Sequence, residues 1–491
     1  MDKSVDTAII VVYLGAMLGF GFWGKTRTRD STDFLVAGRR LGPALYTGTM
    51  AAVVLGGAST VGGVGLGYRY GISGMWLVVA IAVGLLSLSL AFAGRIQRLR
   101  VFTVAQMLNL RYGTDFTSWS GFVMAAYTLM LAVTSTIAYA TIFTVLFDIG
   151  RTASVILGGV IVMLYSAIGG MWSITLTDMV QFVLKTIGVF ALLLPFTWHR
   201  AGGLDGIRAR AADSFFDPSA IGTQTIVTYF VVYSFGMLIG QDIWQRVCTA
   251  RSPGVAKWGG TAAAIYCLCY GIAGALIGMA ASTFLPHVTA QDDVYAIIAH
   301  TILPAGISGL VLAAAIAAMM STASGALIAT ATVARADIAP LLGLGRSATT
   351  DPADKAGQDV EGDRRYVVAL GALIIVIAAL LDDVVSALTV SYAILVGGLL
   401  VPILGAFLWK RATGMGALCA MIAGTAVTLG TMCVFGLAAN QPIYCGLAAS
   451  AAAYVIGSLA TNPTAPDVLQ RWTDRLAQRA SAAGTLGTLS E

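Results

Sequence analysis

Charged residues are scarce in this chain of 491 residues. Asp, Glu, Lys and Arg make up only 11% of it, whereas hydrophobic residues make up 57%. Soluble domains carry about 25% charged residues. Glutamate is nearly absent, since only Glu361 and Glu491 occur. The composition therefore excludes a soluble globular protein and predicts a polytopic membrane protein, and the lack of glutamate in the apolar segments weakens a proton-relay interpretation.

Several kinds of active site are also missing. The six cysteines have neither zinc-binding nor redox spacing, so we interpret them as small packing residues. No nucleophile–base set, metal-ligand cluster or phosphate loop is visible, and the glycine-rich run does not follow a soluble strand as a dinucleotide site would require. The N-terminus, with Asp2, Lys3 and Asp6, lacks the positive region of a cleavable signal peptide. We therefore expect no enzyme.

Apolar stretches of about 20 residues indicate transmembrane helices. The expected fold is an all-α polytopic membrane protein with about thirteen spans. The count could change by one, because the stretch 153–197 is nearly continuous and is divided only at Gly169-Gly170. The candidate spans lie near 5–24, 43–68, 74–94, 117–147, 153–171, 173–197, 223–244, 258–284, 306–334, 366–382, 386–409, 414–436 and 442–460.

Basic residues suggest the orientation of these spans. Lys25, Arg27 and Arg29 follow the first span, and most other lysines and arginines fall in every second loop, which the positive-inside rule assigns to the cytoplasm. We expect a cell-membrane protein with its N-terminus outside and its C-terminus inside. Residues 1–461 would form the transporter domain and 462–491 a cytoplasmic tail. The loop 198–222 would be external, and 335–365 a flexible cytoplasmic connector.

The stretch from Met50 to Gly71 is apolar but unusually rich in glycine, including the pairs Gly56-Gly57 and Gly62-Gly63. Broken backbone at membrane depth must face protein or a wet cavity. A glycine-interrupted apolar segment is therefore a pointer to a transporter binding site. The alternative is close helix packing, because small residues let backbones approach each other.

A second break is expected five spans later, around Ser234, Gly236 and Gly240. Two broken spans that lie five helices apart with opposite orientation indicate an inverted repeat. We place the two repeats at about 43–197 and 223–409.

Hydroxyl side chains cluster in the otherwise apolar ninth span at Ser321, Thr322 and Ser324. Hydroxyls in membrane helices usually bond back to a carbonyl of the preceding turn. The alternative is a monovalent cation site, in which hydroxyls and freed carbonyls supply neutral oxygens. Such a site needs an unwound partner helix, and residues 50–57 are the candidate.

Charges inside the spans are few. Asp178 is a functional candidate because a buried charge in the bilayer is costly, but it could also cap its helix or pair with Lys185, two turns further on. Lys185 could equally extend towards the membrane surface. Asp242 and Arg246 are spaced i,i+4 and could pair at the inner face.

Five stretches together resemble the sodium:solute symporter family, which includes bacterial carriers for proline, pantothenate, sialic acid and galactose. They begin at Asp33-Phe34-Leu35-Val36-Ala37-Gly38-Arg39-Arg40-Leu41-Gly42 and continue with the glycine-rich segment 52–71. The others are Trp172-Ser-Ile-Thr-Leu-Thr-Asp178-Met-Val-Gln181, Gly240-Gln-Asp-Ile-Trp-Gln-Arg246 with Ala250-Arg-Ser252, and Ala317-Ala-Met-Met-Ser-Thr-Ala-Ser324. The resemblance implies a LeuT-like inverted five-helix repeat and sodium as the coupling ion.

The resemblance also implies site residues. The principal sodium site would use the carbonyls of Ala52, Leu55 and Ala318 and the hydroxyls of Ser321 and Thr322. A second sodium would use Asp178, Ser321 and Ser324, although Gly325 stands where some members have a further hydroxyl. The substrate positions depart more from the family pattern. The candidate solute contacts form an uncharged pocket, in which helix dipoles could hold a carboxylate. They are Val54, Gly56, Ser59, Tyr127, Tyr233 and Gln241.

The function that these features favour is sodium-coupled symport, in which a small neutral, zwitterionic or monocarboxylate solute enters by alternating access. Three alternatives remain open: a transporter-like sensor, which would usually carry a long signalling domain; an ion channel, which would place its polar groups in rings; and a carrier coupled to protons instead of sodium.

Overall fold

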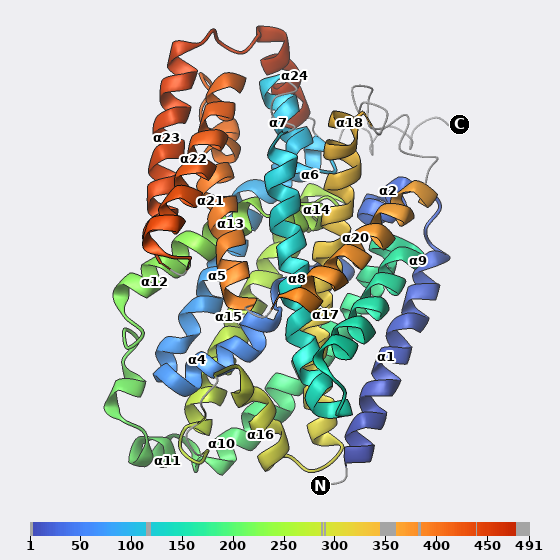
Figure 1. The fold of residues 1–491 in the computed structure, drawn as a ribbon, viewed down its shortest axis with the longest axis vertical. Coiled ribbons are helices and arrows are strands. Elements are labelled where there is room, and N and C mark those ends of the chain that lie inside the picture. Colours follow the sequence, from blue (N-terminus) through green and yellow to red (C-terminus); the bar gives the residue numbers. More distant parts are fainter. Residues whose placement is uncertain are drawn as a thin grey trace, which may run out of the picture.

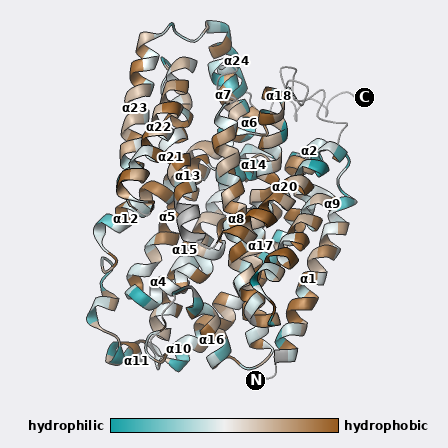
Figure 2. Ribbon diagram, in the orientation of Figure 1, coloured by the Kyte–Doolittle hydropathy of each residue, from teal (hydrophilic) through white to brown (hydrophobic). Residues whose placement is uncertain are grey.

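The computed structural model describes residues 3–113, 119–285, 288, 291–343, 360–381, 384–437 and 439–477. Within these residues the chain is helical and has no β-strand, apart from one isolated bridge between Leu41 and Ala250. Figure 1 shows long helices that run along the longest axis, with short helices at both ends. Figure 2 shows hydrophobic ribbon through the middle of the molecule and hydrophilic ribbon mainly towards its ends, as a membrane protein requires.

The first half of the chain contains α1 (Lys3–Lys25), α2 (Ser31–Val36) and α3 (Pro43–Val54). A π-helical turn, η2 (Ala58–Gly62), leads into α4 (Gly63–Tyr70), and η3 (Gly71–Met75) leads into α5 (Trp76–Ser87). The chain then forms η4 (Leu88–Ala93), α6 (Gly94–Leu99), α7 (Val104–Tyr112), α8 (Ser120–Phe147), α9 (Arg151–Thr186), η6 (Ile187–Leu193) and α10 (Leu194–Arg200).

The second half begins with α11 (Gly203–Arg210), η7 (Asp213–Phe216), α12 (Thr223–Tyr229), η8 (Phe230–Ser234), α13 (Phe235–Ile239) and α14 (Gln241–Val247). It continues with α15 (Pro253–Ala281), α16 (Val294–Ile302), α17 (Ile307–Val333), η10 (Ala334–Ile338) and α18 (Ala339–Leu341). The last described helices are α20 (Val360–Leu380), α21 (Val384–Leu408), α22 (Gly414–Phe435), α23 (Gln441–Ala460) and α24 (Pro466–Ala477).

Helix α17 is the centre of the bundle. Every residue from 311 to 333 is buried, and the helix packs against α1, α3, α8, α9 and α20. Small residues make this possible, because its sequence is dominated by alanine and hydroxyl residues that let neighbouring backbones approach closely. The ninth predicted span therefore lies in the protein core and not against lipid.

Among the described residues, nine helical segments are long and apolar enough to cross a membrane, or ten if the pair Thr223–Ile239 and Gln241–Val247, bent by 46°, is one span. One segment, Arg151–Arg200, has 50 residues. At about 1.5 Å per residue it would be far longer than the roughly 30 Å hydrocarbon core if it were straight. The all-α architecture is confirmed, and the count of thirteen spans stays a prediction.

The long segment is divided at Gly170, where the backbone adopts φ 56° and ψ −137°. This conformation is nearly restricted to glycine. An added Cβ would also collide with the carbonyl oxygen of Phe34 on α2. Glycine is therefore required both for the bend and for the close approach, which agrees with the division expected at Gly169-Gly170.

One expectation about a loop needs correction. The connector 335–365 is helical at both described ends, in η10 and α18 and from Val360 onwards, and an ion pair joins Arg335 to Asp363 across it. Its middle lies outside the described residues. After Thr461, α24 buries Trp472 against Phe407 of α21, with ring centroids 5.4 Å apart. The loop 198–222, which we expect to be external, contains the helices α11 and η7.

We predict that Gly170→Ala destabilises the protein, because backbone strain at such a conformation costs on the order of 1–3 kcal/mol before the clash with Phe34 is added. The measurement is the apparent melting temperature of purified protein. Gly430→Ala is the matched control, since a Cβ at this position in α22 meets nothing within 4 Å. Equal melting temperatures for both variants would show that the bend does not depend on glycine.

Candidate functional site

Helix α3 stops in the middle of the protein. Its last residue is Val54, and Leu55 leaves the helix with φ −93° and ψ 77°. Helical structure resumes at Ala58. Gly56 allows the break to lie directly against α17, because a Cβ there would be only 2.6 Å from Thr322 Oγ1. The predicted break is thus present, and the last turn of α3 has carbonyls without helical partners.

Side chains of α17 and α9 bind these carbonyls. Ser321 Oγ donates to Ala52 O at 2.8 Å, and Thr322 Oγ1 donates to Val53 O at 2.8 Å. Lys185 Nζ donates to Ala52 O at 2.7 Å and to Leu55 O at 3.2 Å, and lies 3.5 Å from Ser321 Oγ. A hydroxyl pair and an ammonium group therefore hold the broken end of α3.

The structure brings together the residues predicted for the principal cation site. Ala52, Leu55 and Ser321 share contacts with one atom, Lys185 Nζ. Ala318 O lies 2.9 Å from Ser321 Oγ and 3.3 Å from Thr322 Oγ1. Both hydroxyls lie within hydrogen-bond distance of a carbonyl of their own helix, as back-bonding predicts, and also of a carbonyl of α3, the helix that the cation-site hypothesis requires.

Lys185 is the residue whose role the sequence did not reveal. It is fully buried, and among the described residues no carboxylate oxygen lies within 4.0 Å of its Nζ. The two sequence-based interpretations, a pair with Asp178 and an extension to the membrane surface, are therefore both wrong. The available signal was a lysine in the middle of an apolar span, at a position where only a protein partner can satisfy three N–H donors.

Asp178 has a different partner from those expected. Its Oδ2 lies 3.0 Å from Arg246 Nη2, both side chains are fully buried, and the Thr49 hydroxyl also donates to this oxygen. The expected i,i+4 pair between Asp242 and Arg246 does not form, because the guanidinium of α14 points to α9 instead. The pair joins two spans that are far apart in the sequence.

The second predicted sodium site is not assembled by direct contacts. Ser324 Oγ donates to Ser321 O at 3.1 Å, which is the back-bond typical of a membrane helix. Asp178 is occupied by Arg246 and Thr49, and no hydrogen bond joins it to Ser321 or Ser324 among the described residues.

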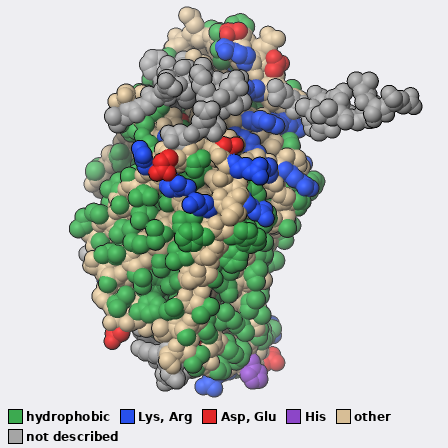
Figure 3. Space-filling view, turned by 90° about the vertical axis from the view of Figure 1, so that its right-hand side faces the viewer, with side chains coloured by type: hydrophobic (Ala, Val, Ile, Leu, Met, Phe, Trp, Pro, Cys, Tyr) green, Lys and Arg blue, Asp and Glu red, His purple; other side chains and the backbone are tan. Residues whose placement is uncertain are grey.

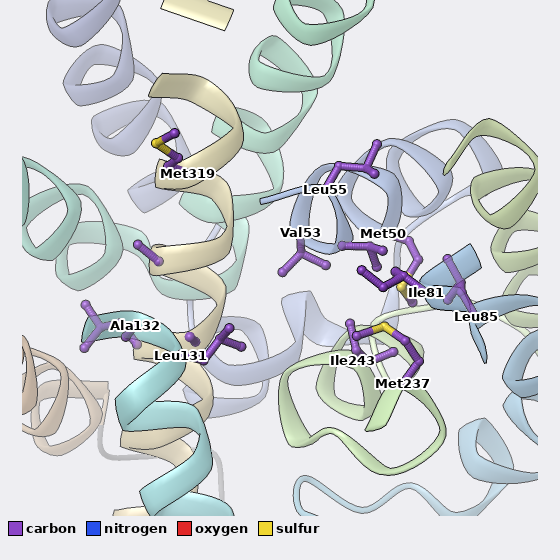
Figure 4. Close-up of a cluster of buried hydrophobic side chains, with 14 of the residues drawn as sticks. Met50, Val53, Leu55, Ile81, Leu85, Leu131, Ala132, Met237, Ile243 and Met319 are labelled. Atoms are coloured by element: carbon purple, nitrogen blue, oxygen red, sulfur yellow. The ribbon is translucent and has the colours of Figure 1, made fainter. Parts of the chain in front are cut away.

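A cavity of about 470 Å³ lies beside the break of α3. Val54, Gly56, Ser59 and Tyr233, four of the candidate solute contacts, line it. Figure 4 shows the apolar side chains of this region, with Val53 on α3 and Met319 on α17, and both of these residues also belong to the cavity wall. Val53 and Thr322 line the cavity and also belong to the carbonyl–hydroxyl cluster, so the two features share a wall.

Two solute candidates do not line this cavity. Gln241 is used by the backbone near α7, since its Nε2 donates to Phe102 O at 2.9 Å and its Oε1 accepts from Val104 N at 2.9 Å. Tyr127 stands behind the wall, packed edge-on against Tyr392 with its hydroxyl 3.4 Å from Asp242 Oδ1. Gln241 is therefore corrected to a structural residue, and Tyr127 to a supporting one.

The cavity wall is apolar with a negative bias. Its charged residues are Asp242 and Asp293, it includes His300, and none of its described lining residues is a lysine or an arginine. Hydroxyls of Ser59, Thr134 and Ser135 add neutral polar groups. The pocket expected to be uncharged thus contains two carboxylates, and one of them, Asp242, belongs to the broken seventh span.

We predict that Asp178→Asn lowers the apparent melting temperature, because breaking a buried ion pair from one side costs roughly 3–5 kcal/mol. Sodium should not restore the loss. The control is Asp467→Asn, which breaks a pair with Arg471 on α24 whose side chains are 70% and 71% exposed and which should cost at most about 1 kcal/mol. If Asp178→Asn melts like the wild type but loses stabilisation by sodium, Asp178 is a sodium ligand instead.

Comparison with known proteins gives the same picture. The family model for the sodium:solute symporter family matches residues 34–424. The sodium/pantothenate symporter of Escherichia coli is 25% identical over 480 residues, which cover 91% of this chain and 95% of that protein. The osmoregulated proline transporter of Bacillus subtilis is 26% identical over 458 residues, covering 88% and 89%.

Solved structures show the same fold. A substrate-bound, outward-open structure of a Na⁺-coupled sialic acid symporter superposes with a TM-score of 0.81 at 19% identity, covering 94% of this chain and 98% of that one. The nucleobase-cation-symport-1 family transporter Mhp1, closed with bromovinylhydantoin bound, gives a TM-score of 0.61 at 14% identity, covering 90% and 98%. Both neighbours are LeuT-fold transporters. The chain therefore belongs to the sodium:solute symporter family, and it is a multi-pass, sodium-coupled symporter of a small organic solute and not an enzyme.

Proposed function

We propose that the 470 Å³ cavity binds a small neutral or zwitterionic solute and that the carrier imports it together with sodium. The observation that carries this proposal is the shared wall between the cavity and the broken end of α3. Val53 O accepts a hydrogen bond from Thr322 Oγ1, and both residues line the cavity. A cation that rearranges this carbonyl–hydroxyl cluster thereby changes the wall that the solute touches.

The wall favours a solute with an amino group. Asp242 contributes a negative charge, and no cationic side chain balances it in the described lining. The helical segment that starts at Ala58 directs its N-terminal, partly positive end towards the break, where a carboxylate is stabilised. A zwitterion matches both ends, whereas a simple monocarboxylate faces Asp242 without compensation. We therefore favour the zwitterionic class over the monocarboxylates.

For sodium we propose the principal ligand set of Ala52, Leu55, Ala318, Ser321 and Thr322. A cation that leaves water needs several oxygens at once, and an intact helix offers almost none. The break of α3 beside the α17 hydroxyls supplies both carbonyl and hydroxyl oxygens. Sodium would then join α3 to α17, and it shifts the carrier between states only by its different affinity for them. The contacts of Asp178 give no support to a second sodium.

We further propose that residues 43–197 and 223–409 are inverted repeats. The supporting observation is that a span in each is interrupted beside the cavity, at Leu55–Gly57 and at Gly240, where Thr223–Ile239 and Gln241–Val247 meet at 46°. Two broken helices facing one cavity are typical of transporters in which one bundle moves against the rest.

The orientation that we propose places the N-terminus outside and the tail, 462–491, in the cytoplasm. Figure 3 shows lysines and arginines gathered towards the end of the molecule that carries α24 and α18 in Figure 1, while the opposite end, where α1 begins, shows few. Basic residues remain on the cytoplasmic side during insertion.

The experiment on function is uptake into proteoliposomes under an inward sodium gradient, with potassium replacing sodium in the control. We expect accumulation of an amino-acid-like zwitterion and not of its analogue without the amine. Asp242→Asn should weaken zwitterion binding about tenfold or more, since a buried charged partner is lost, while Asp205→Asn on the outer helix α11 should change nothing. Uptake that ignores sodium, or that prefers the amine-free analogue, contradicts the proposal.

The experiment on orientation uses cysteine labelling in intact cells, in a background without native cysteines. Ser214 of η7 and Gln470 of α24 are both exposed. We expect Ser214→Cys to react with a membrane-impermeant thiol reagent and Gln470→Cys to react only after the cells are permeabilised. The reverse pattern would invert the proposed orientation.

A further inference from the structure

The ammonium group of Lys185 contacts oxygens that belong to the ligand set proposed for sodium. Its Nζ lies within 2.7 Å of Ala52 O and 3.2 Å of Leu55 O, and 3.5 Å from Ser321 Oγ. These three oxygens are part of the proposed principal sodium ligand set. An ammonium group, like a sodium ion, carries one positive charge and seeks several oxygen acceptors, but it is attached to the protein.

We propose that the Lys185 ammonium and a sodium ion are alternative occupants of one site, so that Lys185 determines how much sodium the carrier requires. The inference rests on the sodium ligands named under the proposed function. It goes beyond them, because it assigns a specificity-determining role to a residue of α9 that is not itself a ligand.

The first reason is the supply of oxygen atoms. The break of α3 frees only a few carbonyls, and Ser321 and Thr322 already bind those of Ala52 and Val53. Ala52 O accepts from both Lys185 and Ser321, so a further cation at this carbonyl must displace the ammonium. Sodium therefore binds only when Lys185 Nζ has moved away.

The second reason is charge. Two positive charges a few ångströms apart in a poorly screened interior repel each other strongly. No carboxylate oxygen within 4.0 Å of Lys185 Nζ compensates for the charge among the described residues, since Asp178 on the same helix pairs with Arg246. A sodium ion entering this cluster meets the Lys185 ammonium without a carboxylate in contact with it, which adds to the competition for ligands.

Exclusion of this kind lowers the apparent sodium affinity by the fraction of molecules in which the site is free. It also gives the sodium-free carrier a bound cation at the broken helix, so that α3, α9 and α17 remain tied together when sodium is absent. Removing the ammonium should therefore increase sodium affinity, which a merely structural loss of a lysine would not do.

The test is equilibrium binding of ²²Na⁺ to the purified full-length protein without solute, with N-methyl-D-glucamine keeping ionic strength constant. Lys185→Met keeps a side chain of similar length and removes the charge. We expect its half-saturating sodium concentration to be at least about tenfold lower than that of the wild type. Lys257→Met is the matched control, because Lys257 lies on α15 against the Trp258 ring, outside the cluster, and it should bind sodium as the wild type does.

Two further variants make the result decisive. Lys185→Gln removes the charge but keeps a hydrogen-bond donor, and it should change sodium affinity in the same direction if Lys185→Met does not fold. Adding Ser321→Ala to either variant should remove most of the gained affinity, which places the gain at this site.

Sodium binding in Lys185→Met or Lys185→Gln that is no tighter than in the wild type overturns the inference, as does a gain that persists after Ser321→Ala. Because no solute is present, this failure is separate from failure of the proposed transport function, which appears as absent uptake under a sodium gradient.

Discussion

The structure depends on one interruption of the backbone. Where α3 ends at Val54, peptide carbonyls lose their helical partners in the middle of a protein that spans a membrane, and each must find another donor. They find it in the hydroxyls of Ser321 and Thr322 and in the ammonium of Lys185. Those donors come from α17 and α9, so the interruption ties three helices together around carbonyl and hydroxyl oxygens of the kind that can replace the water shell of a small cation.

Among the described residues, three buried charged ones lie near this interruption, and only two of them form an ion pair within 4.0 Å. Arg246 neutralises Asp178, and both are fully buried. Lys185, two turns further along α9, is left with carbonyl and hydroxyl oxygens alone. A buried ammonium group is costly unless it is well coordinated, and the oxygens that coordinate it belong to the ligand set proposed for sodium. The solute cavity adjoins the same cluster through Val53 and Thr322. In the proposed arrangement, ion, ammonium and solute would act on one wall, which would provide a physical basis for coupling.

Much of this site could be predicted from the sequence, since local patterns carry it. The glycine pair at Gly56-Gly57 indicated the break, and a hydroxyl cluster in an apolar helix indicated the donors. The convergence of Ala52, Leu55, Ala318, Ser321 and Thr322 followed from the family resemblance. The fold class followed from composition and apolar spans, and the bend at Gly170 from a glycine pair in an overlong apolar stretch.

The errors concern partners that are distant in the sequence. Spacing along one helix suggested pairs of Lys185 with Asp178 and of Arg246 with Asp242. Instead, the packing of α9 against α3 joins Lys185 to carbonyls, and Arg246 of α14 reaches Asp178 of α9. Gln241 looked like a solute contact because it follows the break at Gly240, yet its amide is used by the loop before α7. Sequence spacing cannot report these choices, because they depend on which helices are neighbours.

The central claim is that one cluster of oxygens serves Lys185 and sodium in turn. The most direct measurement is a pair of experimental structures of the full-length protein, one in sodium-free buffer and one in saturating sodium. We predict that Lys185 Nζ bonds Ala52 O and Leu55 O without sodium, and that an ion takes these oxygens with sodium while the lysine withdraws. An ion bound to these oxygens while Lys185 keeps both carbonyl contacts would contradict the account.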